Sequence, residues 1–311
     1  MNDRTLRFGG LALAVGLALV LPQIIYPVLA LDVLLWGLFA VALNLLLGYG
    51  GLLSFGHAAF WGSAAYAAGI AAKQWALPFP VAALCAMLFA VLLALPIGYL
   101  SIRRTGIYFA MVTLAFAQMV FYIVNQWREV TGGENGLQAI PRTLFGLNLS
   151  APITFYYASL PLVLLGFMVA YRVVHSPFGH VIVAIRDNEA RAKALGYPTG
   201  RYKLLVFLIS AALSGLAGGL FALGHGFAAL EVVHWTTSGT VVMMTVLGGM
   251  GTLWGGIVGA ALLLLLRDWL STWTDAWGVI TGGIFVLVVL GFRRGIWGSV
   301  VHNLSIRREK P

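Results

Sequence analysis

The chain has 311 residues, of which 60% are hydrophobic and only 9% charged, and its mean hydropathy is +0.93. A soluble domain usually carries about 25% charged residues, and it cannot hide so much apolar surface from water. The composition therefore excludes a soluble protein and predicts an integral membrane protein. The net charge of +9 lies in short clusters between long apolar runs, which is typical of membrane topology rather than of nucleic-acid binding.

Charged residues divide the chain into long charge-free intervals. A helix needs about 20 residues to cross a bilayer, so six intervals hold one pass each and two hold two passes each. The sequence predicts an all-α polytopic membrane protein with about ten transmembrane helices, folded as one transmembrane domain over residues 1–311. The intervals are 8–31, 33–72, 74–102, 105–127, 143–171, 204–230, 232–266 and 276–292, of which 33–72 and 232–266 are the double ones.

The first interval follows Arg4 and Arg7, a pattern that also fits a secretory signal. Val28 and Ala30 would form its cleavage site, before Leu31. Because the stretch is long enough to span a bilayer and a whole membrane domain follows it, we expect it to be retained as a helix.

The distribution of Lys and Arg tests the topology independently. With ten passes and both termini in the cytoplasm, 15 of these residues fall inside and 4 outside, which is a strong positive-inside bias. The four outside are Lys73, Arg128, Arg142 and Arg267; the 15 inside are Arg4, Arg7, Arg103, Arg104, Arg172, Arg186, Arg191, Lys193, Arg201, Lys203, Arg293, Arg294, Arg307, Arg308 and Lys310.

Both double intervals are interrupted by glycines near their middle. Interrupted helices at membrane depth are tolerated only where they face protein or a water-filled route, so these breaks are candidates to line a translocation path. The candidate path residues are Gly48, Gly50, Gly51, Ser54 and His57 in the first break, and Gly248, Gly249 and Gly251 in the second.

The topology places one main loop on each side of the membrane. Residues 127–153 form the outer, periplasmic loop, and residues 173–203 the inner, cytoplasmic loop. The candidate residues of the outer loop are Thr131, Gly132, Gly133, Asn135 and Gly136.

The inner loop contains the signature of a short helix. Asp187 is expected as its N-cap, Glu189 lies in its first turn, Ala190 and Ala194 follow, and Gly196 can take the left-handed stop. A helix of about two turns is not stable alone. It therefore predicts a docking surface for a partner.

The chain lacks the motifs of several enzyme classes. None of its four lysines follows a glycine, so the Walker A ending is absent and any ATP energy must come from another polypeptide. No zinc-hydrolase or nucleophile-elbow motif is present, and no metal site or cofactor is expected. Ser54 and His57 lie three residues apart, but without a nearby acid they favour a packing role over nucleophilic catalysis.

Secondary transport is the alternative from another class. Ion-coupled carriers usually place acidic or basic side chains inside the membrane, whereas here Glu231, Asp268 and Asp275 lie near predicted outer boundaries. His57 and His225 are isolated candidates for a relay, and helix-packing hydrogen bonds are favoured for both. A stand-alone ion-coupled carrier or channel is therefore the less favoured hypothesis.

Five stretches, in order, resemble hallmarks of the LivM-type permeases, the membrane subunits of bacterial branched-chain amino acid importers. The resemblance covers about residues 40 to 298. It departs from the family pattern at His180, where an arginine would be expected. The stretches are Gly50–Ala58, Gly106–Ala115, Thr131–Gly136, Ser176–Gly179 with Ala184–Glu189, and Leu247–Thr252.

The resemblance implies a multi-pass protein of the bacterial inner membrane, surrounded by lipid and without nucleic-acid partners. Its expected partners are a LivH-like second permease, two cytoplasmic ATPase subunits that bind ATP and Mg, and a periplasmic amino-acid-binding protein. The resemblance also assigns residues 189–196 as the helix that couples to the ATPase. Urea, short-amide and aromatic-acid importers use a similar subunit, so the substrate stays open.

Overall fold

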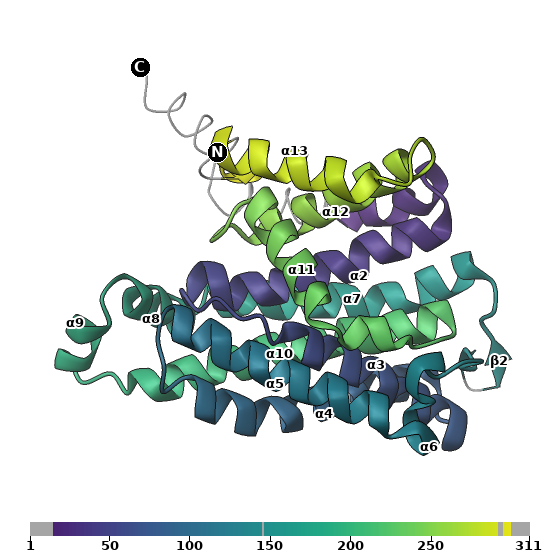
Figure 1. Ribbon diagram of the computed structural model, residues 1–311, viewed down its shortest axis with the longest axis horizontal. Helices are drawn as coiled ribbons and strands as arrows, with labels where there is room; N and C mark the ends of the chain where they lie inside the picture. Colours follow the sequence, from purple (N-terminus) through teal and green to yellow (C-terminus); the bar gives the residue numbers. More distant parts are fainter. Residues whose placement is uncertain (1–14, 145, 292–294, 300–311) are drawn as a thin grey trace.

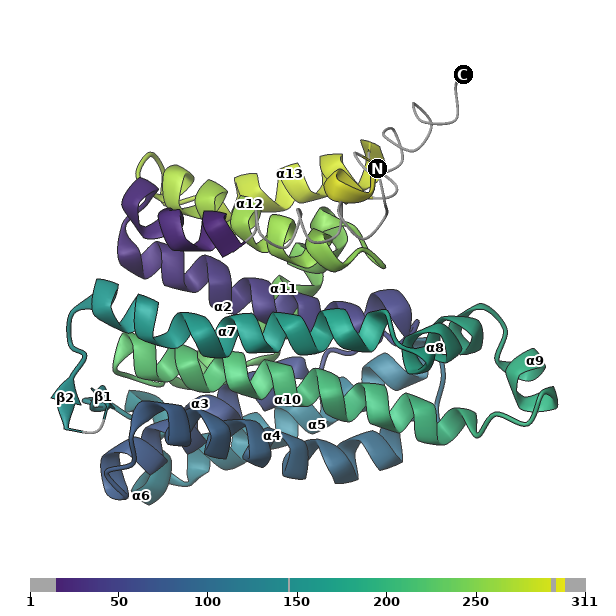
Figure 2. The same cartoon turned by 180° about the vertical axis from the view of Figure 1, so that it is seen from behind.

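The computed structural model describes residues 15–144, 146–291 and 295–299. In this part of the chain nearly all regular structure is helical, and most helices run along the long axis of the molecule (Figure 1). Helices α12 (Leu253–Ser271) and α13 (Trp277–Gly291) form a layer against α2 (Pro27–Asn44), and the remaining long helices lie on the other side of α2 (Figures 1 and 2).

Seven helices of the described residues are long and apolar enough to cross a membrane, which confirms an all-α polytopic membrane protein. Three further helices lie where the sequence predicts the other passes, but they do not meet that criterion: Val15–Ile24, α3 (His57–Gln74) and α11 (Trp235–Gly248). The count of ten passes therefore stays a prediction. The remaining long helices are α4 (Phe79–Ser101), α5 (Ile107–Gln126), α7 (Pro152–Val174) and α10 (Thr199–His225).

Helix α10 lies at the centre because small residues let its neighbours approach. A Cβ at Gly215 or Gly219 would collide with Ala90 or Ala86 of α4, and one at Gly218 would overlap the backbone of Trp61. In a membrane the hydrophobic effect does not drive helices together, because lipid is as apolar as the helices. Close backbone approach of this kind supplies the packing contacts instead.

The boundary between the first two passes differs from the prediction. We expected the chain to turn at Asp32, but the first helix ends at Ile24 and α2 begins at Pro27. Proline is favoured at the first helical position because it lacks an N–H that would be unpaired there. Asp32 remains inside α2 because its carboxylate has a partner, the His225 ring, at 2.7 Å.

Both double intervals are interrupted as predicted. In the first, α2 continues into a π-helical turn, η1 (Leu45–Tyr49), and the chain is then irregular as far as Gly56. In the second, α11 ends at Gly248 and α12 begins at Leu253. π-Helical turns are uncommon and often mark functional sites.

The two main loops lie at opposite ends of the molecule, which agrees with the predicted arrangement (Figure 2). One end carries α8 (Pro177–Asp187) and α9 (Glu189–Ala194). The other carries α6 (Arg128–Thr131), η2 (Gly133–Asn135) and the hairpin of β1 (Thr143–Leu144) and β2 (Leu147–Asn148). The prediction that both termini lie in the cytoplasm concerns residues outside those that the structure describes.

Candidate functional site

The two glycine-rich breaks, about 200 residues apart in sequence, meet in space. Asn44 at the end of α2 joins them: its amide nitrogen donates to the Thr252 carbonyl at 2.7 Å, and its amide oxygen accepts from the Gly251 N–H at 3.0 Å. Asn44 is almost completely buried, so this double hydrogen bond is shielded from competing water. We call this contact, made by Asn44, Gly48, Gly251, Thr252 and Arg186, the junction.

Arg186, the penultimate residue of α8, connects the inner loop to the junction. Its guanidinium donates to the Gly48 carbonyl at 2.6 Å and, through two other nitrogens, to the carboxylate of Asp187 at 2.8 and 3.0 Å. The Gly48 carbonyl belongs to η1, where the π-helical turn frees backbone acceptors from the ordinary α-helical pattern. Arg186 therefore ties the helix that precedes α9 to the broken part of α2.

Glycine is required at the centre of the junction. A Cβ at Gly48 would overlap the Asn44 side chain and the backbone of Gly251. Gly51 has a φ of +68°, and a Cβ there would lie 2.6 Å from Cγ of Arg186. Gly251 has a φ of +74°, in the left-handed region that glycine favours.

The other predicted glycines serve the packing around the junction. Gly248 and Gly249 end α11, and a Cβ at Gly248 would overlap the carbonyl oxygen of Gly255 in α12. Gly50 follows η1 with an ordinary helical φ, but its Cβ would lie 2.6 Å from the Leu46 carbonyl oxygen. Helices α11 and α12 consequently approach through their backbones, whereas the space beside Gly50 is closed by the preceding turn of its own segment.

Ser54 and His57 lie in a buried chain of hydrogen bonds. The Ser54 hydroxyl is 2.9 Å from His57 Nδ1, and Ser210 Oγ is 2.8 Å from His57 Nε2. Since Ser210 donates its only hydrogen to the Ala42 carbonyl, Nε2 must be the protonated nitrogen and Nδ1 must accept from Ser54. These hydrogen bonds join α3, α10 and α2, which agrees with a helix-packing role for Ser54 and His57.

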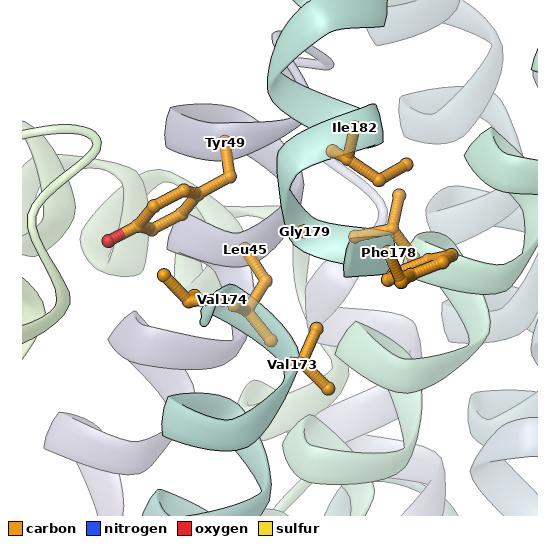
Figure 3. Close-up of a pocket in the computed structure, with 8 residues that line it drawn as sticks. Leu45, Tyr49, Val173, Val174, Phe178, Gly179 and Ile182 are labelled. Atoms are coloured by element: carbon orange, nitrogen blue, oxygen red, sulfur yellow. The ribbon is translucent and has the colours of Figure 1, made fainter. Parts of the chain in front are cut away.

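A small apolar hollow lies beside the junction, between η1, the end of α7 and the start of α8. Figure 3 shows Leu45 and Tyr49 of η1 and Val174 of α7 on one side of it, and Phe178 and Ile182 of α8 on the other. It has room for about one water molecule, so it cannot hold an organic substrate.

The inner loop contains the expected short helix, with a different cap. Asn188, not Asp187, is the N-cap of α9: its side-chain oxygen accepts from the Arg191 N–H at 2.9 Å. Asp187 is unavailable because α8, which we did not predict, continues through it. Gly196 takes the left-handed conformation, with a φ of +87°, as expected.

The surface of α9 is small and open. Ala190 and Ala194 are exposed, as is Leu195 with 72% of its surface accessible, whereas Ala192 faces inward. The helix projects from one end of the molecule (Figure 1). Its exposed side is therefore free of contacts with the described part of the chain.

Glu189 fastens α9 to α10. Its carboxylate accepts from Lys203 at 2.6 Å and from Lys193 at 3.1 Å, and Thr199 donates to it at 3.1 Å. Burial raises the pKa of Glu189, but the hydrogen bonds from the two lysines outweigh it and hold the pKa below its usual range. The carboxylate is therefore charged at neutral pH.

The predicted outer-loop residues form a compact turn. The Thr131 hydroxyl shares its one hydrogen between the Val124 and Trp127 carbonyls, at 2.6 and 2.8 Å, and accepts from the Gly133 N–H at 3.2 Å. Gly132 ends α6 with a φ of +80°.

The next part of this loop is attached to the chain after α10. A Cβ at Gly136 would overlap the Ala228 carbonyl oxygen, and Leu137 exchanges two backbone hydrogen bonds with Ala228. Asn135 contributes a carbonyl oxygen that accepts from the Gln138 amide at 3.2 Å.

Sequence reasoning missed the partner of His225. The ring pairs with Asp32 and packs against Phe221, with ring centroids 4.3 Å apart. The histidine is therefore not isolated. The two residues are 193 positions apart in sequence, so no local sequence pattern could have revealed the pair. The available signal was an acid inside a hydrophobic stretch, which indicates a buried partner.

Comparison with known proteins gives a consistent result. Residues 27–289 match the family described as branched-chain amino acid transport system / permease component. The chain is 31% identical over 298 residues to the high-affinity branched-chain amino acid transport system permease protein LivM of Escherichia coli K12, covering 87% of this chain and 69% of that protein. LivM of Salmonella typhimurium gives the same identity and coverage.

A more distant similarity extends to another import system. The autoinducer 2 import system permease protein LsrC of Yersinia enterocolitica is 30% identical over 199 residues, covering 58% of this chain and 51% of that protein. No solved structure matches the chain significantly.

Proposed function

The chain belongs to the family of permease components of branched-chain amino acid transport systems, and on this premise we propose that it carries branched-chain or other hydrophobic amino acids. It is a multi-pass permease of the bacterial inner membrane within an ATP-binding-cassette importer. The substrate assignment follows the transport function for which the LivM relatives are named. Urea and short amides are the competing substrates of the same architecture.

The chain itself would supply the path and not the energy. We propose that two separate ATPase subunits bind ATP and Mg, since the sequence has no Walker A motif. A second, LivH-like permease would complete the membrane part, and a periplasmic binding protein would deliver the amino acid to the end that carries Thr131 to Gly136.

The observation that best supports this function is the connection between α9 and the junction. A partner that moved α9 would pull on α8, and Arg186 would transfer the movement to Gly48 and from there, through Asn44, to the turn at Gly251. The junction contains the interrupted parts of two membrane helices. Movement of the ATPases would in this way reach the helices of the path, without nucleotide binding to this chain.

Replacing Ala194 with glutamate tests the docking role of α9. Bulk and an unpaired charge in a buried protein contact typically cost several kcal/mol, whereas the same change on a solvated surface costs within about 0.5 kcal/mol. We expect Ala194→Glu to lose the ATPase subunits on purification of the complex and to lose substrate-stimulated ATP hydrolysis.

The matched control is Ala184→Glu, because Ala184 is also exposed but lies on α8. This variant should retain the ATPase. Retention of the ATPase by Ala194→Glu, with undiminished stimulation, would refute docking through α9.

A separate experiment identifies the substrate. It measures uptake by the intact complex of leucine, isoleucine, valine, urea and acetamide.

A further inference from the structure

Helices α4 and α5 are neighbours with different exposed faces. The exposed residues of α4 are mostly aliphatic, including Leu84, Leu88 and Leu92, and the one with a polar atom, Tyr99, lies near the end of the helix. This composition is expected for contact with lipid. The exposed face of α5 contains Gln118 and Tyr122, beside Met111. Two adjacent helices of one bundle are thus suited to different surroundings.

Gln118 lies at the middle of its helix. It is four positions before Tyr122 and close to the centre of α5, Ile107–Gln126, so with a rise of 1.5 Å per residue it is roughly 2 Å from mid-depth. Its side chain is exposed and makes no hydrogen bond within the described residues. An amide without a partner is costly in hydrocarbon, which argues against lipid at this position.

Further polar groups continue the same side of α5. Asn125 is seven positions from Gln118, two helical turns along the same line, and is half-buried. Phe121, on this side of the helix, contacts the His234 ring with centroids 5.1 Å apart. His234 in turn is the N-cap of α11, so the polar side of α5 faces the edge shared with α11.

Helix α11 presents a matching surface. Thr236 is exposed, Thr240 and Met243 are partly exposed, and Gly239 between them has no atom within 4 Å of an added Cβ. Hydroxyl groups, thioethers and an open glycine are an unusual composition for a lipid-facing surface. Both α5 and α11 lie on the near face in Figure 1.

We propose that this α5–α11 face lines the aqueous translocation path and that Gln118 contacts the charged groups of the passing amino acid. A glutamine amide both donates and accepts hydrogen bonds, so it can serve the carboxylate as well as the ammonium group, while Met111 and Met243 offer adaptable apolar contact to the side chain. The part concerning the substrate rests on the proposed function; the part concerning water does not.

The accessibility of position 118 to water is measured first. In the assembled complex in membranes, with Cys85 replaced by alanine, we compare Gln118→Cys with Leu92→Cys on α4, where 69% of the leucine is exposed. We expect a charged, membrane-impermeant thiol reagent to label position 118 from one side and to leave position 92 unlabelled, and we expect leucine to slow the labelling.

Two results of this experiment would overturn the proposal. Labelling of position 118 only by a lipid-soluble maleimide, as at position 92, would place Gln118 against lipid. Labelling by neither reagent would place it in a dry contact with the second permease. A wrong substrate assignment would give a different result from either of these. The charged reagent would still label position 118 from the aqueous side, and leucine would not slow the labelling.

The role of the amide is tested by Gln118→Leu and Gln118→Asn. Loss of a hydrogen bond to a charged group corresponds to about a 10-fold change or more, so Gln118→Leu should raise the KM for uptake about 10-fold in a complex that still assembles. Gln118→Asn should recover part of the loss. An unchanged KM in Gln118→Leu would contradict a contact with the substrate.

Discussion

The junction and the α5–α11 face differ in what they need from outside the chain. At the junction, Asn44, Gly48, Arg186, Gly251 and Thr252 form hydrogen bonds with one another at 2.6 to 3.0 Å, and a Cβ at Gly48 would overlap the Asn44 side chain. The α5–α11 face leaves Gln118 without a partner among the described residues. The hydrogen bonds of the first region are complete within this chain, whereas on our proposal those of the second are completed by water and substrate.

This difference predicts where substitutions act. Changes around the junction should alter the folded state or the movement of the chain itself, because backbone and side chains there are in direct contact. Changes on exposed surfaces such as α9 should leave the fold intact and be detectable only in the assembled transporter. The predictions below test the comparison, from the largest expected effect to the smallest.

The largest effect is expected where a methyl group has no space. Gly248→Ala places a Cβ on the Gly255 carbonyl oxygen, whereas Gly239→Ala on the same helix meets no atom within 4 Å. Overpacking costs typically 1–3 kcal/mol or more, and alanine in an open helical position is favoured by roughly 0.5–1 kcal/mol. Thermal unfolding in detergent should show a lower midpoint for Gly248→Ala and an unchanged or higher one for Gly239→Ala. Equal midpoints would mean that α11 and α12 are not in backbone contact.

The next effect concerns the connection through Arg186. Lysine keeps the charge but has no planar fork to reach Gly48 and Asp187 together, so Arg186→Lys should lower ATP-driven uptake about 10-fold, the value of a lost charge-assisted hydrogen bond. The ATPase subunits should still co-purify. Arg201→Ala, at an exposed position, is the control and should transport normally. Normal uptake by Arg186→Lys would show that the junction does not transmit movement.

A smaller effect is expected at the attachment of α9. Glu189→Gln leaves the buried Lys203 ammonium with a weaker acceptor, which costs roughly 1–3 kcal/mol of local order. Amide hydrogen exchange at residues 189–197 should become faster, while exchange in α10 stays unchanged.

Acidification tests the same contact in the native protein. Because the pKa of Glu189 is lower in the folded state than in the unfolded state, its contribution is present above the usual carboxylate pKa of about 4.3. It is lost as the pH falls through the lowered folded value. Exchange in α9, corrected for the intrinsic pH dependence, should therefore be constant from pH 7 to pH 5. A loss of protection already at pH 6 would contradict the lysine contacts.

Local sequence patterns predicted the helices and both breaks, because hydropathy and glycine act over a few residues. The left-handed stop at Gly196 was predicted for the same reason. The cap of α9 was misplaced by one residue, since Asp187 and Asn188 are equally good caps and only the continuation of α8 decides between them.

Long-range pairs were not predictable in this way. Arg186 reaches Gly48 across 138 positions, and Asp32 reaches His225 across 193. Charges were used as markers of helix boundaries, so Asp32 was misread as a turn. Gln118 carries no charge and passed unnoticed in an apolar interval, although an uncharged amide at mid-depth also demands a partner.

The most direct test of the central claim, a permease driven by ATP and not by an ion gradient, is uptake of labelled leucine into proteoliposomes. They would hold this chain with its second permease, ATPase and binding-protein partners, either with ATP and Mg and no gradient, or with a proton gradient and no ATP. The Asp32→Asn variant is included because Asp32 and His225 are the one acid–histidine pair of the described residues. The account predicts that leucine is taken up only in the presence of ATP, and that the Asp32→Asn variant keeps about half or more of this uptake. The account would be contradicted by uptake driven by the proton gradient in the absence of ATP and abolished in Asp32→Asn.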